Sequence, residues 1–248
     1  ETVPQDDRGA ALVLDAEGRF APIAFAEAAL IAAARAEAAG IGIVAVTGPG
    51  SLGRIAPYAR AIASAGLVGL IAVGSPPLVA PHGGNAAALG TNPVATGIPT
   101  STTPIVVDAS SSLLTKGRWG ELRARGEQVP DGVAIDADGA VTRDAELVRA
   151  FLPRGGAFGS AMGIVVEMIV NGLTGSLGSS RERRSASVVA LRSLEIDAPL
   201  TAVGDDLRAR LEAAGGHVPG SNTPDAAGPV SVSTATLQRL AKIANTAG

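Results

Sequence analysis

Near the middle of the chain runs the segment Pro81-His82-Gly83-Gly84-Asn85-Ala86-Ala87-Ala88-Leu89-Gly90-Thr91-Asn92-Pro93. It belongs to a longer stretch, residues 61–107, that contains no Asp, Glu, Lys or Arg. We expect such a stretch to be mostly shielded from water, although its glycines and prolines prevent one regular element. An irregular buried loop must satisfy its backbone N–H and C=O groups, and a bound ligand can do so. Composition alone leaves two interpretations open: a ligand cradle, or a core crossover that pairs with its own backbone.

A strand is expected at residues 104–107. It ends at Asp108, the first charged residue after the uncharged stretch, and Ser110-Ser111-Ser112 follow shortly after. Acidic residues at the carboxyl ends of strands in α/β sheets often contact ligands, so Asp108 could accept hydrogen bonds from ribose hydroxyls. An Asp followed by three serines is also typical of a helix N-cap. Both interpretations of Asp108 remain open.

The chain offers few groups for acid–base chemistry. His82 is the best candidate because the pKa of imidazole lies nearest neutrality, although a lone loop histidine is more often structural. His217 lies in a glycine-rich loop and is expected to be inert, and Glu167 is expected to be paired inside an apolar helix. Neither a Gly-x-Gly-x-x-Gly nor a Walker motif is present. Backbone N–H groups at Gly83-Gly84 could still contact a phosphate, with side-chain hydrogen bonds from Thr91-Asn92.

The amino-acid composition indicates a globular protein and argues against several kinds of partner and ligand. Of 248 residues, 46% are apolar and 17% charged, which indicates a folded globular chain. Aromatic residues make up only 2% and the net charge is −3, so we expect no nucleic-acid partner. Cysteine is absent and there are two histidines, which argues against a metal site built on these ligands. No signal peptide and no unbroken membrane-spanning run is recognisable, so a cytoplasmic protein without membrane contact is expected.

The pattern of elements predicts an α/β architecture. Strands expected at 11–14, 41–46 and 67–73 alternate with helices at 22–39 and 52–65. Further expected elements are helices at 113–125, 144–152, 162–173, 200–214 and 233–245, a strand at 188–191, and a polar loop at 179–185. We expect one unit over 1–248, with a cofactor-binding subdomain around 67–185 and a remainder formed by 1–66 and 186–248.

Several segments together resemble the type-2 malate/L-lactate dehydrogenase family. They are the 81–95 run, residues 105–112, Gly126-Glu127-Gln128-Val129-Pro130-Asp131-Gly132, Leu152-Pro153-Arg154-Gly155-Gly156 and the tail from about 228 to 244. The resemblance implies a non-Rossmann α/β fold, a homodimer, and NAD(P)-dependent oxidation or reduction of a small hydroxy acid or cyclic imino acid. It also implies that NAD or NADP lies along Thr91, Asn92, Pro93, Asp108, Ser112, Gly155, Gly156 and Gly159.

The chain departs from the family pattern at three places. The family's proton-donating histidine, in Asn-x-x-His-Phe-Gly, corresponds to Ser51 in Gly48-Pro49-Gly50-Ser51-Leu52-Gly53, and a serine hydroxyl is too weak an acid to replace imidazole. The family's Gly-Gly-His-Lys-Gly is here Gly155-Gly156-Ala157-Phe158-Gly159. The family's N-terminal segment, with a Ser-His-Gly motif and a substrate-binding arginine, would lie before Glu1.

These departures leave three hypotheses. The first is an NAD(P)-dependent oxidoreductase with a non-standard proton donor, for which His82 and Ser51 are the candidates. The second is a non-redox enzyme that uses the same cleft for a cyclisation or an elimination. The third is a catalytically silent relative that acts as a binding or partner subunit.

Overall fold

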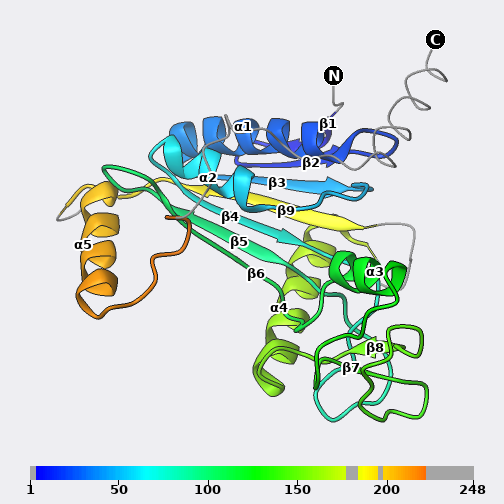
Figure 1. Cartoon of the computed structure of the whole chain (residues 1–248). Helices are drawn as coiled ribbons and strands as arrows, with labels where there is room; N and C mark the ends of the chain where they lie inside the picture. Colours follow the sequence, from blue (N-terminus) through cyan, green and yellow to red (C-terminus); the bar gives the residue numbers. More distant parts are fainter. Residues whose placement is uncertain (1–3, 177–183, 195–197, 222–248) are drawn as a thin grey trace, which may run out of the picture.

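The computed structural model describes residues 4–176, 184–194 and 198–221. Its centre is a seven-stranded sheet in the order β1-β2-β3-β9-β4-β5-β6, drawn in Figure 1. Strands β2 and β3 pair in parallel, and the other neighbouring pairs are antiparallel. The strands are β1 (Pro4–Arg8), β2 (Ala11–Asp15), β3 (Ile41–Thr47), β4 (Val68–Val73), β5 (Val94–Ile98), β6 (Ile105–Ala109) and β9 (Ser185–Leu191).

Two helices, α1 (Ala21–Ala39) and α2 (Ala56–Ser64), pack on one face of the sheet (Figure 1). The buried face of α1 is almost all alanine, which lets the helix axis lie close to β3. Gly42 of β3 shows how close, because a Cβ at this position would come within 2.0 Å of the carbonyl oxygen of Ala32. Gly40 ends α1 in the left-handed conformation that favours glycine.

Helix α4 (Ala157–Thr174) packs on β9, β3 and β4. Its 18 residues have a mean hydropathy of 1.4, so by length and composition alone α4 resembles a membrane span, as core helices of water-soluble proteins also do. Its outward side is apolar, with Phe158, Ile164 and Met168 exposed to solvent. The one charged side chain of α4, Glu167, is directed at the loop before β5.

A second, smaller core lies below the sheet in Figure 1. It contains α3 (Lys116–Ala124) and a two-stranded sheet of β7 (Ala134–Ile135) and β8 (Ala150–Phe151). Phe151 is buried there, and the Trp119 ring meets it edge-on at 5.7 Å between ring centroids. Helix α5 (Leu200–Ala213) packs on the turn between β5 and β6. The seven-stranded sheet contains strands from both parts that were expected from sequence, residues 67–185 and the remainder formed by 1–66 and 186–248.

The structure confirms most of the expected elements and corrects several others. The helix expected at 144–152 is wrong: one turn at 145–147 is followed by β8, and the Asp144 carboxylate accepts a hydrogen bond from Glu146 N in a local turn. Helix α2 begins at Ala56 and α3 at Lys116, later than expected, whereas α4 begins earlier, at Ala157. Strands β1, β5, β7 and β8 were not expected. Most of the 179–185 loop, and all of the helix expected at 233–245, lie outside the described residues.

Candidate functional site

The uncharged segment turns sharply at Asn92, just before β5. Asn92 has φ 40°, the single positive φ at a non-glycine residue in the described ranges, and it is fully buried. Its side-chain oxygen accepts a hydrogen bond from Ser75 N at 3.1 Å, and its amide nitrogen donates to Gly163 O at 2.9 Å and to Glu167 Oε1 at 3.2 Å. Asparagine tolerates the left-handed region, and these bonds fix it there.

Glu167 joins this loop to α4. Its Oε1 accepts hydrogen bonds from Gly90 N at 3.0 Å and from the Asn92 amide, and its Oε2 accepts one from Asn171 Nδ2 at 3.2 Å. The expectation that Glu167 is paired internally is therefore confirmed. A carboxylate bound by three N–H donors holds the loop against the helix.

The three serines after β6 bind the same loop. Ser110 Oγ donates to Thr91 O at 2.7 Å, and Ser111 N donates to the same oxygen at 3.1 Å. Ser112 is fully buried, and its hydroxyl donates to Leu114 O at 2.6 Å. No helix begins at these serines. Their hydroxyls connect backbone segments that are distant in sequence.

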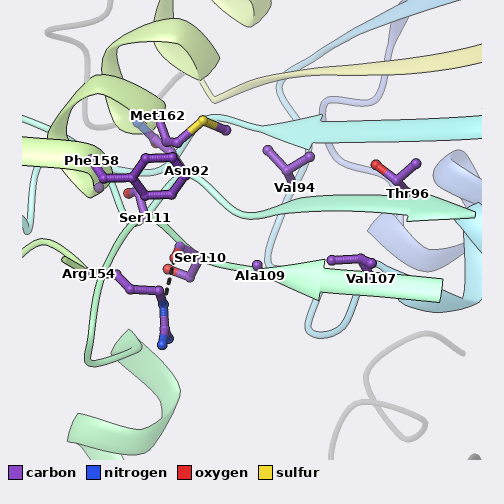
Figure 2. A pocket seen from close by; sticks show the side chains of 11 residues that line it. Asn92, Val94, Thr96, Val107, Ala109, Ser110, Ser111, Arg154, Phe158 and Met162 are labelled. Atoms are coloured by element: carbon purple, nitrogen blue, oxygen red, sulfur yellow. Dashed lines mark hydrogen bonds between the residues drawn. The ribbon is translucent and has the colours of Figure 1, made fainter. Parts of the chain in front are cut away.

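These segments enclose a cavity of about 210 Å³ between β5, β6 and the N-terminal half of α4 (Figure 2). Its apolar wall is formed by Val94, Val107, Ala109, Phe158 and Met162. Its polar residues are Asn92, Thr96, Ser110, Ser111 and Arg154, and Gly159 completes the lining. Position 159 requires glycine because its backbone lies very close to two neighbouring segments. A Cβ there would come within 2.4 Å of Arg154 O and 2.6 Å of Ser111 O.

Five of the residues predicted from sequence lie at or near this cavity. Asn92 and Gly159 line it, and Thr91 and Ser112 are buried in the loops behind it. Asp108 is exposed and accepts a hydrogen bond from Ala56 N at 3.2 Å, so it lies on the α2 side while its neighbours Val107 and Ala109 face the cavity. Of the two interpretations of Asp108, this contact supports helix capping, but the helix is α2, whose first residue is Ala56, and not one that begins at the serines.

Most of the remaining predicted residues lie in the exposed loops near the start of α4 and after β3, whereas Pro93 is half-buried just before β5. His82 is exposed, and its backbone N–H donates to Ser160 Oγ at 2.6 Å. A Cβ at Gly156 would lie 3.2 Å from His82 Nδ1, so the imidazole ring rests against the beginning of α4. Gly83 and Gly84 are exposed, and Gly84 N already donates to Pro81 O. Gly155 is exposed beside Gly156, Pro93 O accepts from Val73 N, and Ser51 is exposed in the loop between β3 and α2.

Among the cavity residues that were not predicted from sequence are Thr96, Arg154, Phe158 and Met162. Phe158 stands where the resembling family has a lysine, but that departure alone did not predict a place in the cavity, and nothing around Arg154 singles it out. Met162 was expected at the beginning of a helix and lies within one. These residues converge only because β5 and α4 meet in the fold.

The size of the cavity can be compared with the nicotinamide cofactor that the family resemblance implies. Sites for drug-sized ligands measure roughly 300–1,000 Å³, so this cavity is too small for a whole dinucleotide. Its largely apolar walls and size fit the nicotinamide ring. The rest of the cofactor would then lie outside the cavity, where the exposed residues Asp108 and Gly155 are found.

Comparison with known proteins gives consistent matches. The family model described as malate/L-lactate dehydrogenase matches residues 2–235. A Delta(1)-pyrroline-2-carboxylate/Delta(1)-piperideine-2-carboxylate reductase of Pseudomonas putida is 37% identical over 166 residues, which is 65% of this chain and 49% of that protein. A malate dehydrogenase of Pyrococcus abyssi is 38% identical over 154 residues, 61% of this chain and 42% of that protein. The chain thus spans about half the length of these curated relatives.

Solved structures agree with this assignment. The crystal structure of delta1-piperideine-2-carboxylate reductase from Pseudomonas syringae pvar. tomato superposes with a TM-score of 0.84 at 28% identity, over 98% of this chain and 80% of that one. A dehydrogenase from Sinorhizobium meliloti gives a TM-score of 0.79 at 28% identity, over 97% of this chain and 73% of that one. Sequence and structure together establish that the chain belongs to the malate/L-lactate dehydrogenase family.

Proposed function

We propose that this chain is an NAD(P)-dependent oxidoreductase that acts on a small 2-hydroxy or 2-oxo acid, or on a cyclic imino acid. The observation that carries the proposal is the cavity, because it lies between the two segments, 91–93 and 155–159, in which the family resemblance implies cofactor contacts. The names of the relatives support the substrate class, since they include reductases of cyclic imino acids and a malate dehydrogenase. We also propose that the fold is of the non-Rossmann type, in keeping with its mainly antiparallel sheet.

In this proposal the cofactor and the protein side chains have separate roles. The cofactor, when bound, supplies or accepts the hydride. The walls of the cavity, formed in part by Phe158, Val107 and Met162, present an apolar surface to the reacting atoms. His82 is the proposed proton donor because it lies beside the start of α4, whereas Ser51 has a hydroxyl too weakly acidic for this role.

The test is a calorimetric and fluorescence titration of the protein with NADH and NADPH. We expect micromolar binding of at least one cofactor. Asp108→Asn should weaken it about tenfold if the carboxylate accepts from ribose hydroxyls, while the Asn side-chain oxygen still accepts from Ala56 N and preserves the cap of α2. Absence of binding at millimolar concentrations of both cofactors would contradict the proposal and leave a non-redox use of the cleft.

We further propose a cytoplasmic homodimer whose two copies meet at the exposed apolar side of α4. This side carries no charge, so two copies related by a twofold axis meet without repulsion, and apolar patches of this kind mark interaction sites. Met168→Glu is expected to convert the dimer to a monomer, because a carboxylate replaces a side chain 70% exposed in this patch. The measurement is mass by light scattering. Leu30→Glu on α1, where Leu30 is 73% exposed, is the matched control and should leave the mass unchanged.

A further inference from the structure

The outward side of α1 carries large apolar side chains that are exposed to solvent. Ile23 is 59% exposed and Leu30 is 73% exposed, and Phe20, which immediately precedes the helix, is 70% exposed. Ala26 and Ala34 are exposed as well. Positions 23, 26, 30 and 34 are three or four residues apart, so they lie in one row along the helix. We call these five residues the α1 stripe.

The α1 stripe contains no charged side chain. The helix has three charged residues among its 19. Each of them already pairs with an oppositely charged side chain elsewhere in the chain: Glu27 with Arg19, Arg35 with Asp7, and Glu37 with Arg192. A helix that is apolar on all sides is usually covered on all sides. The sheet covers the inner side of α1, so the α1 stripe is the side that requires a further partner.

The last described residues of the chain lie beside α2, on the same face of the sheet as α1. Val106 N donates to Pro219 O at 3.0 Å, and Arg60 Nη2 of α2 donates to Gly220 O at 3.3 Å. The side chain of Val106 belongs to the core that α1 forms with the sheet. Helix α2 also packs against α1, as Figure 1 shows. The residues after Ser221 therefore begin one helix away from α1.

The exposed apolar side of α4 is a less suitable surface for these residues. Ile71 of β4 belongs to the core under α1, whereas its neighbour Ala72 packs against α4. Because successive side chains of a strand point to opposite faces, α4 lies on the other face of the sheet. The chain after Ser221 would have to pass around the edge of the sheet to reach it.

The sequence after Ser221 contains one segment suited to the α1 stripe. Residues 233–245 read Ser-Thr-Ala-Thr-Leu-Gln-Arg-Leu-Ala-Lys-Ile-Ala-Asn. Helical spacing puts four apolar residues on one side, namely Leu237, Leu240, Ala241 and Ala244. It puts three polar residues on the other side, namely Gln238, Arg239 and Lys242. The apolar side has the same mixture of large side chains and alanines as the α1 stripe.

Residues 222–232 are long enough to bring this segment to α1. An extended chain covers about 3.3–3.6 Å per residue, so these residues can span roughly 35 Å. The axes of packed helices lie roughly 8–10 Å apart. A path from Ser221 over α2 to the outward side of α1 uses well under the available length.

We propose that residues 233–245 of this chain pack as a helix on the α1 stripe. In this contact Leu237 and Leu240 pack against the alanines of the stripe, and Leu30 packs against the alanines of the segment. Large side chains opposite small ones allow two helices to interdigitate. The contact requires neither a cofactor nor a second copy of the chain, so it is independent of the proposed function.

The first test uses disulfides, because the chain contains no cysteine and each introduced pair reports a single contact. Ile23→Cys and Leu30→Cys are each combined with Leu237→Cys and with Leu240→Cys. A disulfide requires Cα atoms roughly 4.4–6.8 Å apart. Under mild oxidation of dilute protein, we expect an intramolecular disulfide in at least one of these double variants, identified by mass spectrometry.

Val141→Cys combined with Leu240→Cys is the matched control. Val141 is 57% exposed, close to the value for Ile23, but it belongs to the part of the chain below the sheet in Figure 1. Its disulfide should form at least about tenfold more slowly, because this pair is not held together at a high effective concentration.

Limited proteolysis gives a second readout that needs no cysteine. Trypsin cleaves after Arg and Lys, so Arg239 and Lys242 report whether the segment is accessible. Leu30→Glu places a carboxylate in the α1 stripe and should accelerate cleavage at these two sites about tenfold, because the segment is released more often. Val141→Glu should leave the cleavage rate as in the wild type.

Three results would overturn this proposal. They are the absence of an intramolecular disulfide in all four double variants, a control pair that forms its disulfide as fast as they do, and a cleavage rate that Leu30→Glu leaves unchanged. Disulfides that form only between two molecules, seen as doubled mass on a non-reducing gel, would assign the α1 stripe to a second copy of the chain. Circular dichroism of each variant verifies that it is folded before either test.

Discussion

Gly159→Ala is expected to lower the free energy of unfolding by about 3 kcal/mol and to abolish ligand binding at the cavity. The added methyl group would come within 2.4 Å of Arg154 O and 2.6 Å of both Arg154 N and Ser111 O. All three are backbone atoms, so no change of side-chain rotamer can relieve the contact. The beginning of α4 must move away from the 110–112 loop, and the hydrogen bond from Arg154 N to Ser111 O is lost with it.

Gly172→Ala is the matched control for this prediction. Gly172 lies in the same helix, and a Cβ there meets no atom within 4 Å. Alanine is the better helix former, so this variant should be more stable by about 0.5–1 kcal/mol. Urea denaturation of both variants provides the comparison. Equal stability of the two variants would show that α4 does not pack closely on the 110–112 loop, and the geometry of the cavity would have to be revised.

The parts of the fold that could be predicted from sequence are those with local signals. The alanine-rich run of α1 ends at Gly40, and the apolar runs of β3 and β4 are bounded by turn residues, so their periodicity identified them. Strand β5 had no such signal because its five residues include both Thr96 and Gly97, which leave too short an apolar run. The reason for that glycine is tertiary: a Cβ would come within 2.2 Å of Ala59 O in α2.

The role of a site residue could be predicted only where the sequence around that residue indicates its environment. Glu167 stands alone in an apolar helix, which correctly indicated internal pairing. Asp108 could be recognised as a capping residue, but its partner Ala56 lies 52 positions earlier, beyond any local pattern. Arg154 and Thr96 share the cavity only because β5 and α4 meet, and the sequence contains no spacing that brings them together.

The family resemblance added what local patterns could not supply. It identified residues 91–93 and 155–159 as parts of one site, and both segments do border one cavity. It also drew attention to Ala157-Phe158, where the family has His-Lys, and the Phe158 ring now forms part of the cavity wall. The replacement of a cation by an aromatic ring makes the wall of the cavity more apolar at this position.

Glu167→Ala is expected to destabilise the protein by about 3 kcal/mol, because it removes the acceptor for two buried donors at once. Gly90 N and the Asn92 amide both bind Glu167 Oε1, and each unsatisfied buried donor costs roughly 1–3 kcal/mol. Asn171, the third partner, is partly exposed and can turn to water. The left-handed conformation of Asn92 would lose one of its supports, so the cavity should open as well.

Glu167→Gln separates the hydrogen bonds from the charge. Its side-chain oxygen can still accept from Gly90 N and from Asn92, and its new NH₂ group faces the Asn171 amide, which can rotate to accept from it. We therefore expect Glu167→Gln to cost less than about 1 kcal/mol in urea denaturation. Hydrogen exchange at the Gly90 amide should accelerate strongly in the alanine variant and little in the glutamine variant. Equal exchange rates in the two variants would mean that the carboxylate does not hold this loop, and the buried conformation of Asn92 would need another cause.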